Sequence, residues 1–150
     1  MRRVLLQFGC GPNAKRTDWI DCDGSLNALI NGLPLWVASL VRRFYRFLAG
    51  NRVYDFPNHV RFLRLNKNIR LPSNHADAIF ASHVWEHLYR TDAEAVTREC
   101  WRILKPGGVL RLIVPDFKIL CEEYVRAENP AGADKLNAAM LFCGRSQPSN

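Results

Sequence analysis

The second half of the chain alternates short apolar runs with longer stretches of helical period, and this order constrains the fold most strongly. Residues 76–81 and 109–114 are short and apolar, as buried strands are. Residues 91–104, between these runs, and 117–125, after them, carry apolar side chains at helical spacing. Strand, helix, strand and helix in this order predict a parallel sheet covered by helices.

Local signals predict where the helix over residues 91–104 begins and ends. Thr91 and Glu94 have the spacing of a capping box, in which a hydroxyl and a carboxylate satisfy two backbone amides of the first turn. Pro106, Gly107 and Gly108 predict the end of this helix, because proline and glycine interrupt helical structure.

The first half of the chain adds three expected strands, at residues 4–8, 19–22 and 60–65, which brings the sheet to about five. We expect one α/β domain over residues 1–150, since this length suits a single domain. Residues 25–57 form an expected helical insertion, with a basic, aromatic helix at 35–48. A compact α/β domain normally has a shorter connection at this point.

Composition excludes some classes of protein and leaves others open. No apolar run approaches the roughly 20 residues that cross a bilayer, so no transmembrane segment is expected. The net charge of +7 favours an anionic partner without choosing among nucleic acid, sugar phosphate and acidic membrane. The five cysteines have neither a disulfide framework nor zinc-site spacing and predict reduced thiols in a cytoplasmic protein.

Two features of the first half suggest a ligand site. Gly9 and Gly11 follow a strand directly, and paired glycines let a ligand approach the backbone closely, although they are equally typical of a tight turn. Asp23 ends the second strand, where a carboxylate can accept two hydrogen bonds from a ribose diol. An N-cap or turn role is the alternative for Asp23, and Asp21 is the acid if the strand ends two residues earlier.

The strand over residues 76–81 leads into a third polar cluster. Ser82 and His83 follow it, at the carboxyl edge where open α/β sheets bind ligands. His83 could alternatively bond the backbone at the strand end. Imidazole as a chemical group titrates near neutral pH, which makes His83 a candidate general base.

Taken together, four motifs resemble the class I S-adenosylmethionine-dependent methyltransferases, most nearly a bacterial branch of the type 11 kind. They are Gly9-Cys10-Gly11 and the segments 19–23, 82–88 and 102–108, and they occur in this order. The resemblance covers residues 4 to about 116. It implies a Rossmann-like fold and S-adenosylmethionine as cofactor.

The resemblance also implies roles for individual residues. Gly9, Cys10 and Gly11 would line the methionine part of the cofactor, and Asp23 would hold its ribose. Asn66 stands where the family has an acid near the adenine, and its carboxamide can still bond the adenine amino group. Ser82 and His83 would lie beside the sulfonium and the acceptor. The implied cofactor site is Phe8, Gly9, Cys10, Gly11, Asp23, Asn66, Ser82 and His83.

In this family the sheet has seven strands, the last two forming an antiparallel hairpin beside the fifth. Only five strands are expected here, so we expect the C-terminal hairpin to be missing. The chain is then a fragment, a shortened natural variant, or a protein whose fifth strand a partner or a second copy covers. The cofactor residues lie in the part that is present. We therefore expect micromolar cofactor binding with weak or absent turnover, since parts of the acceptor site lie in the missing strands. A small-molecule or glycan acceptor is favoured, while nucleic acid and lipid stay open.

Three other functions compete with methyl transfer. His83, Glu86 and His87 match the H-x-x-E-H zinc motif, but no third ligand is apparent, so no metal is expected. A nicotinamide dinucleotide site needs a longer crossover than the nine or so residues between the first two strands. The third is a non-catalytic module that binds the cofactor, or that binds a partner or an anionic membrane through the helix at 35–48. That helix could equally cover an acceptor pocket or pack on the domain.

Overall fold

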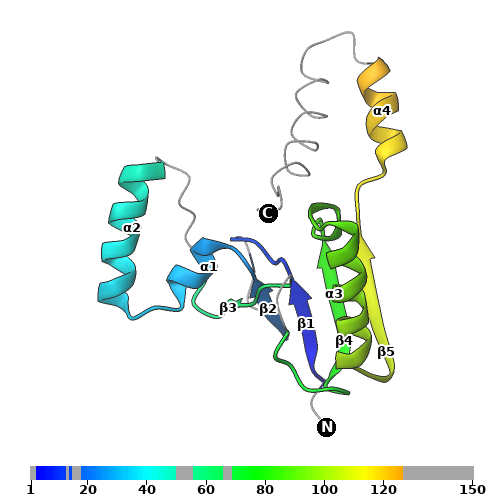
Figure 1. Ribbon diagram of the computed structural model, residues 1–150, viewed down its shortest axis with the longest axis horizontal. Helices are drawn as coiled ribbons and strands as arrows, with labels where there is room; N and C mark the ends of the chain where they lie inside the picture. The colour runs from blue at the N-terminus through cyan, green and yellow to red at the C-terminus, as the bar shows by residue number, and fades with distance from the viewer. Residues whose placement is uncertain (1–2, 13, 15–17, 50–55, 66–68, 127–150) are drawn as a thin grey trace.

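A computed structural model describes residues 3–12, 14, 18–49, 56–65 and 69–126. The described chain contains a five-stranded sheet in the order β3-β2-β1-β4-β5, and every pairing is parallel. Helices flank the sheet, which confirms the predicted α/β, Rossmann-like fold (Figure 1). The strands are β1 (Leu5–Phe8), β2 (Trp19–Asp23), β3 (Arg61–Phe62), β4 (Ala76–Ser82) and β5 (Leu104–Ile113).

The strand order creates a switch point between β1 and β4. From β1 the chain moves outward to β2 and β3, then returns to the other side of β1 and continues through β4 to β5. Loops that leave neighbouring strands in opposite directions open a crevice at their carboxyl ends, where α/β proteins bind ligands. The topology therefore places the candidate site beyond Phe8 and Ser82.

Helices and one short 3-10 turn connect the strands. The helix α3 lies along β4 and β5, whereas α2 and α4 extend away from the sheet at its two sides (Figure 1). The helix α2 packs on α1, which directly follows β2. The helices are α1 (Leu26–Asn31), α2 (Leu35–Ala49), α3 (Arg90–Ile103) and α4 (Phe117–Arg126), and the 3-10 turn is η1 (Trp85–His87).

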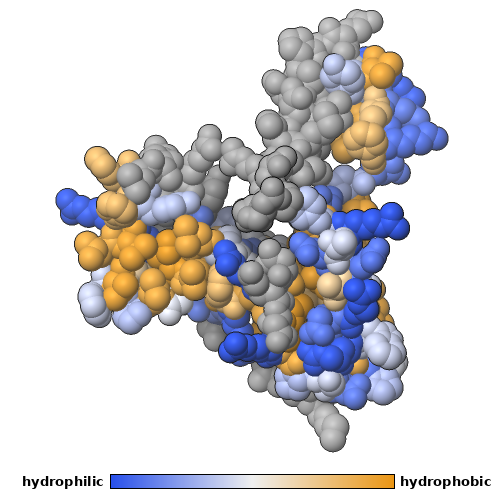
Figure 2. All heavy atoms as spheres, viewed as in Figure 1, coloured by the Kyte–Doolittle hydropathy of each residue, from blue (hydrophilic) through white to orange (hydrophobic). Residues whose placement is uncertain are grey.

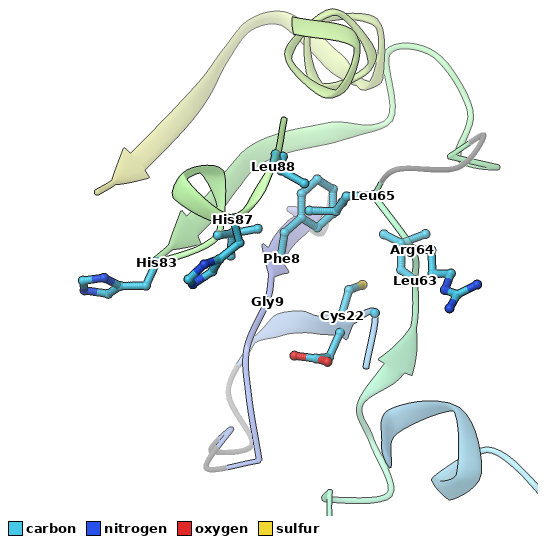
Figure 3. Close-up of a pocket in the computed structure, with 12 residues that line it drawn as sticks. Phe8, Gly9, Cys22, Leu63, Arg64, Leu65, His83, His87 and Leu88 are labelled. Atoms are coloured by element: carbon cyan, nitrogen blue, oxygen red, sulfur yellow. The ribbon is translucent and has the colours of Figure 1, made fainter. Parts of the chain in front are cut away.

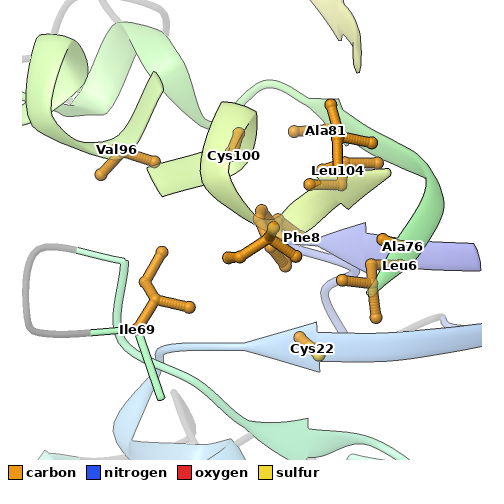
Figure 4. Packing of buried hydrophobic residues seen from close by; sticks show 11 residues of the cluster. Leu6, Phe8, Cys22, Ile69, Ala76, Ala81, Val96, Cys100 and Leu104 are labelled. Atoms are coloured by element: carbon orange, nitrogen blue, oxygen red, sulfur yellow. The ribbon is translucent and has the colours of Figure 1, made fainter. Parts of the chain in front are cut away.

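The main hydrophobic core lies between the sheet and α3 (Figure 4). Val96, Cys100 and Ile103 point from α3 onto the strands and are fully buried, as the helical spacing predicted. Leu6 and Phe8 meet them from β1. A period of 3.6 residues on the helix and of two on the strand thus brings two apolar faces together.

The predicted start of α3 is wrong. The helix begins at Arg90 with Tyr89 as its N-cap, and no side chain caps it. The amide of Ala93 already donates to the carbonyl of Tyr89, at 2.8 Å, so Thr91 lies within the first turn. Glu94 instead pairs with Arg90 one turn earlier, at 3.3 Å. The turn η1 ends at His87, and the helix begins at Arg90, one residue before the expected cap Thr91.

The predicted end of α3 is also wrong. The helix stops at Ile103, and Leu104 already pairs with Ala76 as the first residue of β5. The next pairing joins Val109 to Ala78, so the four residues between Leu104 and Val109 bulge out of the ladder. The proline and glycines therefore belong to this bulge and do not end the helix.

The expected strand over residues 60–65 is much shorter than predicted. Only Arg61 and Phe62 pair with β2, and the amide of Leu63 adds one bond to the Asp23 carbonyl, at 2.9 Å. The chain then leaves the sheet. β3 is its edge strand, with no neighbour among the described residues on its outer side.

Candidate functional site

A cleft of about 460 Å³ opens at the carboxyl ends of β1, β2 and β4, at the switch point of the sheet (Figure 3). Four of the residues predicted for the site line it, namely Phe8, Gly9, Asp23 and His83. The turn after β3 and the segment after β4 form its other walls. The remaining lining residues are Cys22, Gly24, Leu63, Arg64, Leu65, Val84, His87 and Leu88.

Gly9 has a backbone conformation and a neighbour that both exclude a side chain. Its φ is +65°, which L-residues with a side chain rarely adopt. A Cβ built on Gly9 would lie 2.3 Å from Cγ2 of Val84, well inside van der Waals contact. Its amide donates to the carbonyl of Cys22, at 2.8 Å, which fixes the turn against β2. Bare backbone is therefore required at this wall of the cleft.

Asp23 joins the glycine turn to the start of α1. Its Oδ2 accepts a hydrogen bond from the amide of Gly11, at 3.1 Å, and its Oδ1 accepts one from the amide of Ser25, at 2.8 Å. A carboxylate has about four lone-pair sites, so both oxygens keep capacity for a ligand hydroxyl. Ser25 is the N-cap of α1 and accepts from the amide of Ala28, so Asp23 is not the cap.

Asp21, the alternative acid, does not line the cleft. Its side chain is buried, and its Oδ2 lies 3.1 Å from Nε2 of His59. The strand β2 ends at Asp23 and not two residues earlier. Among the described residues, Asp23 is the acid that the cleft presents.

Cys10, Gly11 and Ser82, which were also predicted for the site, do not line the cleft. Cys10 packs against a second small core of Ala28, Phe56 and Val60. Burial, followed by the charge of Asp23, raises the pKa of its thiol to about 12. Gly11 bonds to Asp23 behind the cleft wall, with φ of +67° and open space around it. Asn66 lies outside the described residues.

The segment after β4 carries two histidines and a glutamate. His83 has a φ of 56°, uncommon for a residue with a side chain, and its amide donates to the carbonyl of Ile113, at 2.9 Å. Its Nδ1 lies 3.1 Å from Oε1 of Glu86. Its imidazole points outward, whereas that of His87 lies nearer to Gly9 (Figure 3).

The zinc-site interpretation of this segment has no geometric support. Residues 85–87 form one 3-10 turn, so His83 and His87 are not held one turn apart on an α-helix. No group of three or more His, Cys, Asp or Glu that could hold a metal ion occurs among the described residues.

Several lining residues of the cleft were not predicted from the sequence. Leu63, Arg64 and Leu65 follow β3 at the same carboxyl edge as Asp23, so the edge rule applied to the third strand could have found them. His87 enters because η1 turns the chain back over the glycine turn. No local sequence pattern signals that reversal.

A family model described as a methyltransferase domain matches residues 37–112, which is half of the chain and runs from within α2 to near the end of β5. None of the curated proteins compared with the chain matches it.

Three solved structures are similar at low identity. The [4+2]-cyclase SpnF is 20% identical over 72% of this chain and 37% of its own, with a TM-score of 0.38. A putative S-adenosylmethionine-dependent methyltransferase from Methanococcus maripaludis is 15% identical over 97% and 70%, with a TM-score of 0.41. A DhpI-SAM-HEP complex is 19% identical over 85% and 54%, with a TM-score of 0.45. The chain thus spans little more than a third of the first of these proteins and about half of the third.

Proposed function

This chain belongs to the class I S-adenosylmethionine-dependent methyltransferases, and from that premise we propose that its cleft binds S-adenosylmethionine for methyl transfer to an acceptor. The observation that carries the proposal is the position of the Asp23 carboxylate. It lines the cleft and is held by the amide of Gly11, so an acid and a bare glycine turn lie at one wall. Nucleotide-binding sheets place a ribose-binding acid at this point.

The residues of the cleft fit the chemistry of this cofactor. The volume of the cleft, about 460 Å³, lies within the range of small-molecule sites, roughly 300–1,000 Å³. Leu63, Leu65 and Leu88 offer apolar surface for an adenine ring, while Asp23 offers acceptors for the ribose diol. Gly9, where a Cβ has no room, leaves backbone for the methionine part. When bound, S-adenosylmethionine supplies a methyl group already activated on a sulfonium.

The other predicted residues keep proposed roles of different kinds. Cys10 would contribute through its backbone, because its thiol packs into the second core. Gly11 would act through Asp23, whose carboxylate it orients. Ser82, the last residue of β4, is proposed to lie beside the sulfonium and the acceptor. For Asn66, contact with the adenine remains the proposed role.

His83 is proposed as the general base for acceptors that must lose a proton. If Nδ1–H donates to Glu86, the neutral imidazole has an unprotonated Nε2, which can accept the proton that the methyl acceptor loses. The imidazole is mostly exposed, so an acceptor can reach it from solvent. This arrangement suits a small-molecule or glycan acceptor that occupies the open side of the cleft.

The cysteines support the proposed cytoplasmic location. Cys10, Cys22, Cys100 and Cys121 are all free thiols in the described part of the chain. Free thiols persist in reducing compartments.

Calorimetric titration with S-adenosylhomocysteine tests the proposal. We expect micromolar binding by the full chain and at least about tenfold weaker binding by Asp23→Ala, since a ribose diol would lose its charged acceptor. Asp18→Ala is the matched control, because Asp18 is an exposed aspartate just before β2. Circular dichroism should show that all three proteins are folded. A folded wild-type chain that gives no heat and no thermal shift contradicts the proposal.

A further inference from the structure

One face of α2 carries large apolar side chains that the described residues leave uncovered. Trp36, Leu40, Phe44 and Phe47 recur at intervals of three and four residues and therefore share a face of the helix. Between 64% and 86% of each residue is exposed. The opposite face holds Ala38, which is buried, where α2 packs on α1.

The apolar surface continues onto α1 and the turn between the two helices. Figure 2 shows hydrophobic residues gathered over this part of the molecule. Monomeric soluble proteins rarely expose contiguous apolar patches of this kind, so a patch here indicates a partner surface. We call the exposed residues the α1–α2 patch, and they are Leu26, Leu29, Leu33, Leu35, Trp36, Leu40, Phe44 and Phe47.

The charge of this segment is one-sided. Residues 24–54 contain four arginines and no aspartate or glutamate. Arg43 is exposed and adjoins Phe44 at the border of the apolar stripe, while Arg42 bonds to the side chain of Asn31. A partner of this surface must therefore combine apolar and anionic character.

An anionic bilayer has both properties. Interfacial helices lie in the headgroup region with Trp, Phe and Leu turned inward and basic residues turned toward the phosphates. The 15 residues of α2 span roughly 22 Å, less than the ~30 Å hydrocarbon core. Among the described residues, no helix is long and apolar enough to cross a membrane. The helix would thus lie in the plane of the bilayer.

A second copy of the chain suits the patch less well. A two-fold interface brings the same surface of both copies together. Arg43 of both copies would then share one interface, and residues 24–54 supply no acid to pair with it. Lipid headgroups supply that charge.

We propose that the α1–α2 patch docks this methyltransferase on anionic membranes, a property separate from methyl transfer and from the cleft. Leu26 follows Asp23 by three residues, so docking holds one wall of the cleft beside the lipid surface. The apolar side chains of α2 insert between the lipids, and Arg43 pairs with the anionic headgroups.

Sedimentation with vesicles tests the proposal. The full chain should pellet with vesicles of equal parts phosphatidylglycerol and phosphatidylcholine, less at high salt, and weakly with phosphatidylcholine alone. The double variant Phe44→Glu, Phe47→Glu should bind at least about tenfold more weakly. Arg43→Ala should weaken binding about fivefold on the anionic vesicles only.

A matched control comes from α4, which also exposes apolar side chains. The double variant Phe117→Glu, Val125→Glu should pellet like the wild type. Trp36→Phe should still pellet but lose part of the blue shift of tryptophan emission that lipid causes. S-adenosylhomocysteine binding by the Phe44, Phe47 variant should stay unchanged, which separates this proposal from the cofactor site.

Two results would overturn membrane docking. The first is a folded wild-type chain that stays in the supernatant with both kinds of vesicle. The second is equal pelleting by the wild type and by the Phe44, Phe47 variant. Light scattering that shows a wild-type dimer and a monomeric variant, without lipid binding, would assign the patch to a second copy.

Discussion

The carboxylate of Asp23 accepts a hydrogen bond from the amide of Gly11, 12 residues earlier, at 3.1 Å. This bond ties the loop after β1 to the end of β2, and both loops meet at the candidate cofactor cleft. Gly9, two residues before Gly11, forms the wall of that cleft. The two glycines of this turn differ in the space around them, so they should differ in their tolerance of a side chain.

Replacing Gly9 by alanine should cost far more than replacing Gly11. At Gly9 the new Cβ meets Val84 at 2.3 Å as well as an unfavourable φ, which together cost about 2–5 kcal/mol. At Gly11 φ is equally unfavourable but the space is open, so about 1–2 kcal/mol is expected. Urea unfolding measures both. Adding Val84→Ala to Gly9→Ala should recover the packing part of the loss, and no recovery would contradict the predicted clash.

Removing the thiol of Cys10 should leave the cofactor site intact. The side chain packs on Ala28, Phe56 and Val60 on the far side of the turn. Cys10→Ala should therefore bind S-adenosylhomocysteine within about threefold of the wild type, although cavity formation lowers its stability by about 1 kcal/mol. Calorimetry and urea unfolding report the two effects. A tenfold loss of affinity in a folded variant would place the thiol in the cleft instead.

Asp77 and Lys105 hold the bulge at the start of β5 and should make stability depend on acid pH. Lys105 Nζ lies 2.8 and 2.9 Å from the two carboxylate oxygens, and this hydrogen bond is the main cause that lowers the pKa of Asp77 below its ordinary value of 3.8. A carboxyl group with a lower pKa in the folded state stabilises the protein above its ordinary pKa. That stabilisation is lost as the pH falls through the lower, folded value.

Lys105→Met should lower stability at pH 7 and flatten its decline in acid, because only the backbone bond from Val4 and the charge of Arg3 then lower the Asp77 pKa. Unfolding in urea across the pH range measures this dependence. Lys118→Met, at an exposed lysine of α4, is the control and should keep the wild-type slope. Identical acid profiles for the wild type and Lys105→Met would refute the link.

The contact of α3 with the sheet should dominate stability. Ile103 is fully buried at the end of α3, so Ile103→Ala should lower the free energy of unfolding by about 2–5 kcal/mol. Trp101, two residues earlier, is exposed, and Trp101→Ala should change it by less than about 0.5 kcal/mol. Denaturant titration compares them. Similar losses in both variants would mean that α3 packs through another face.

The sequence by itself determined the order and type of the main elements. Short apolar runs and apolar residues at a period of 3.6 are local signals, and they predicted β1, β2, β4 and the core face of α3 without knowledge of the partners. The glycines at 9 and 11 and the acid at 23 were equally visible as candidates, because bare backbone and a carboxylate at the end of a strand suit a ligand.

Only the tertiary structure decided which of these residues share a cleft. It turned the thiol of Cys10 into a second core, buried Asp21 against His59, and folded His87 back over the glycine turn. It also ended α3 at Ile103, because Leu104 pairs with Ala76 before the chain reaches the helix-breaking proline and glycines. Side-chain direction and element ends depend on contacts between residues far apart in the sequence, and no local pattern contains those contacts.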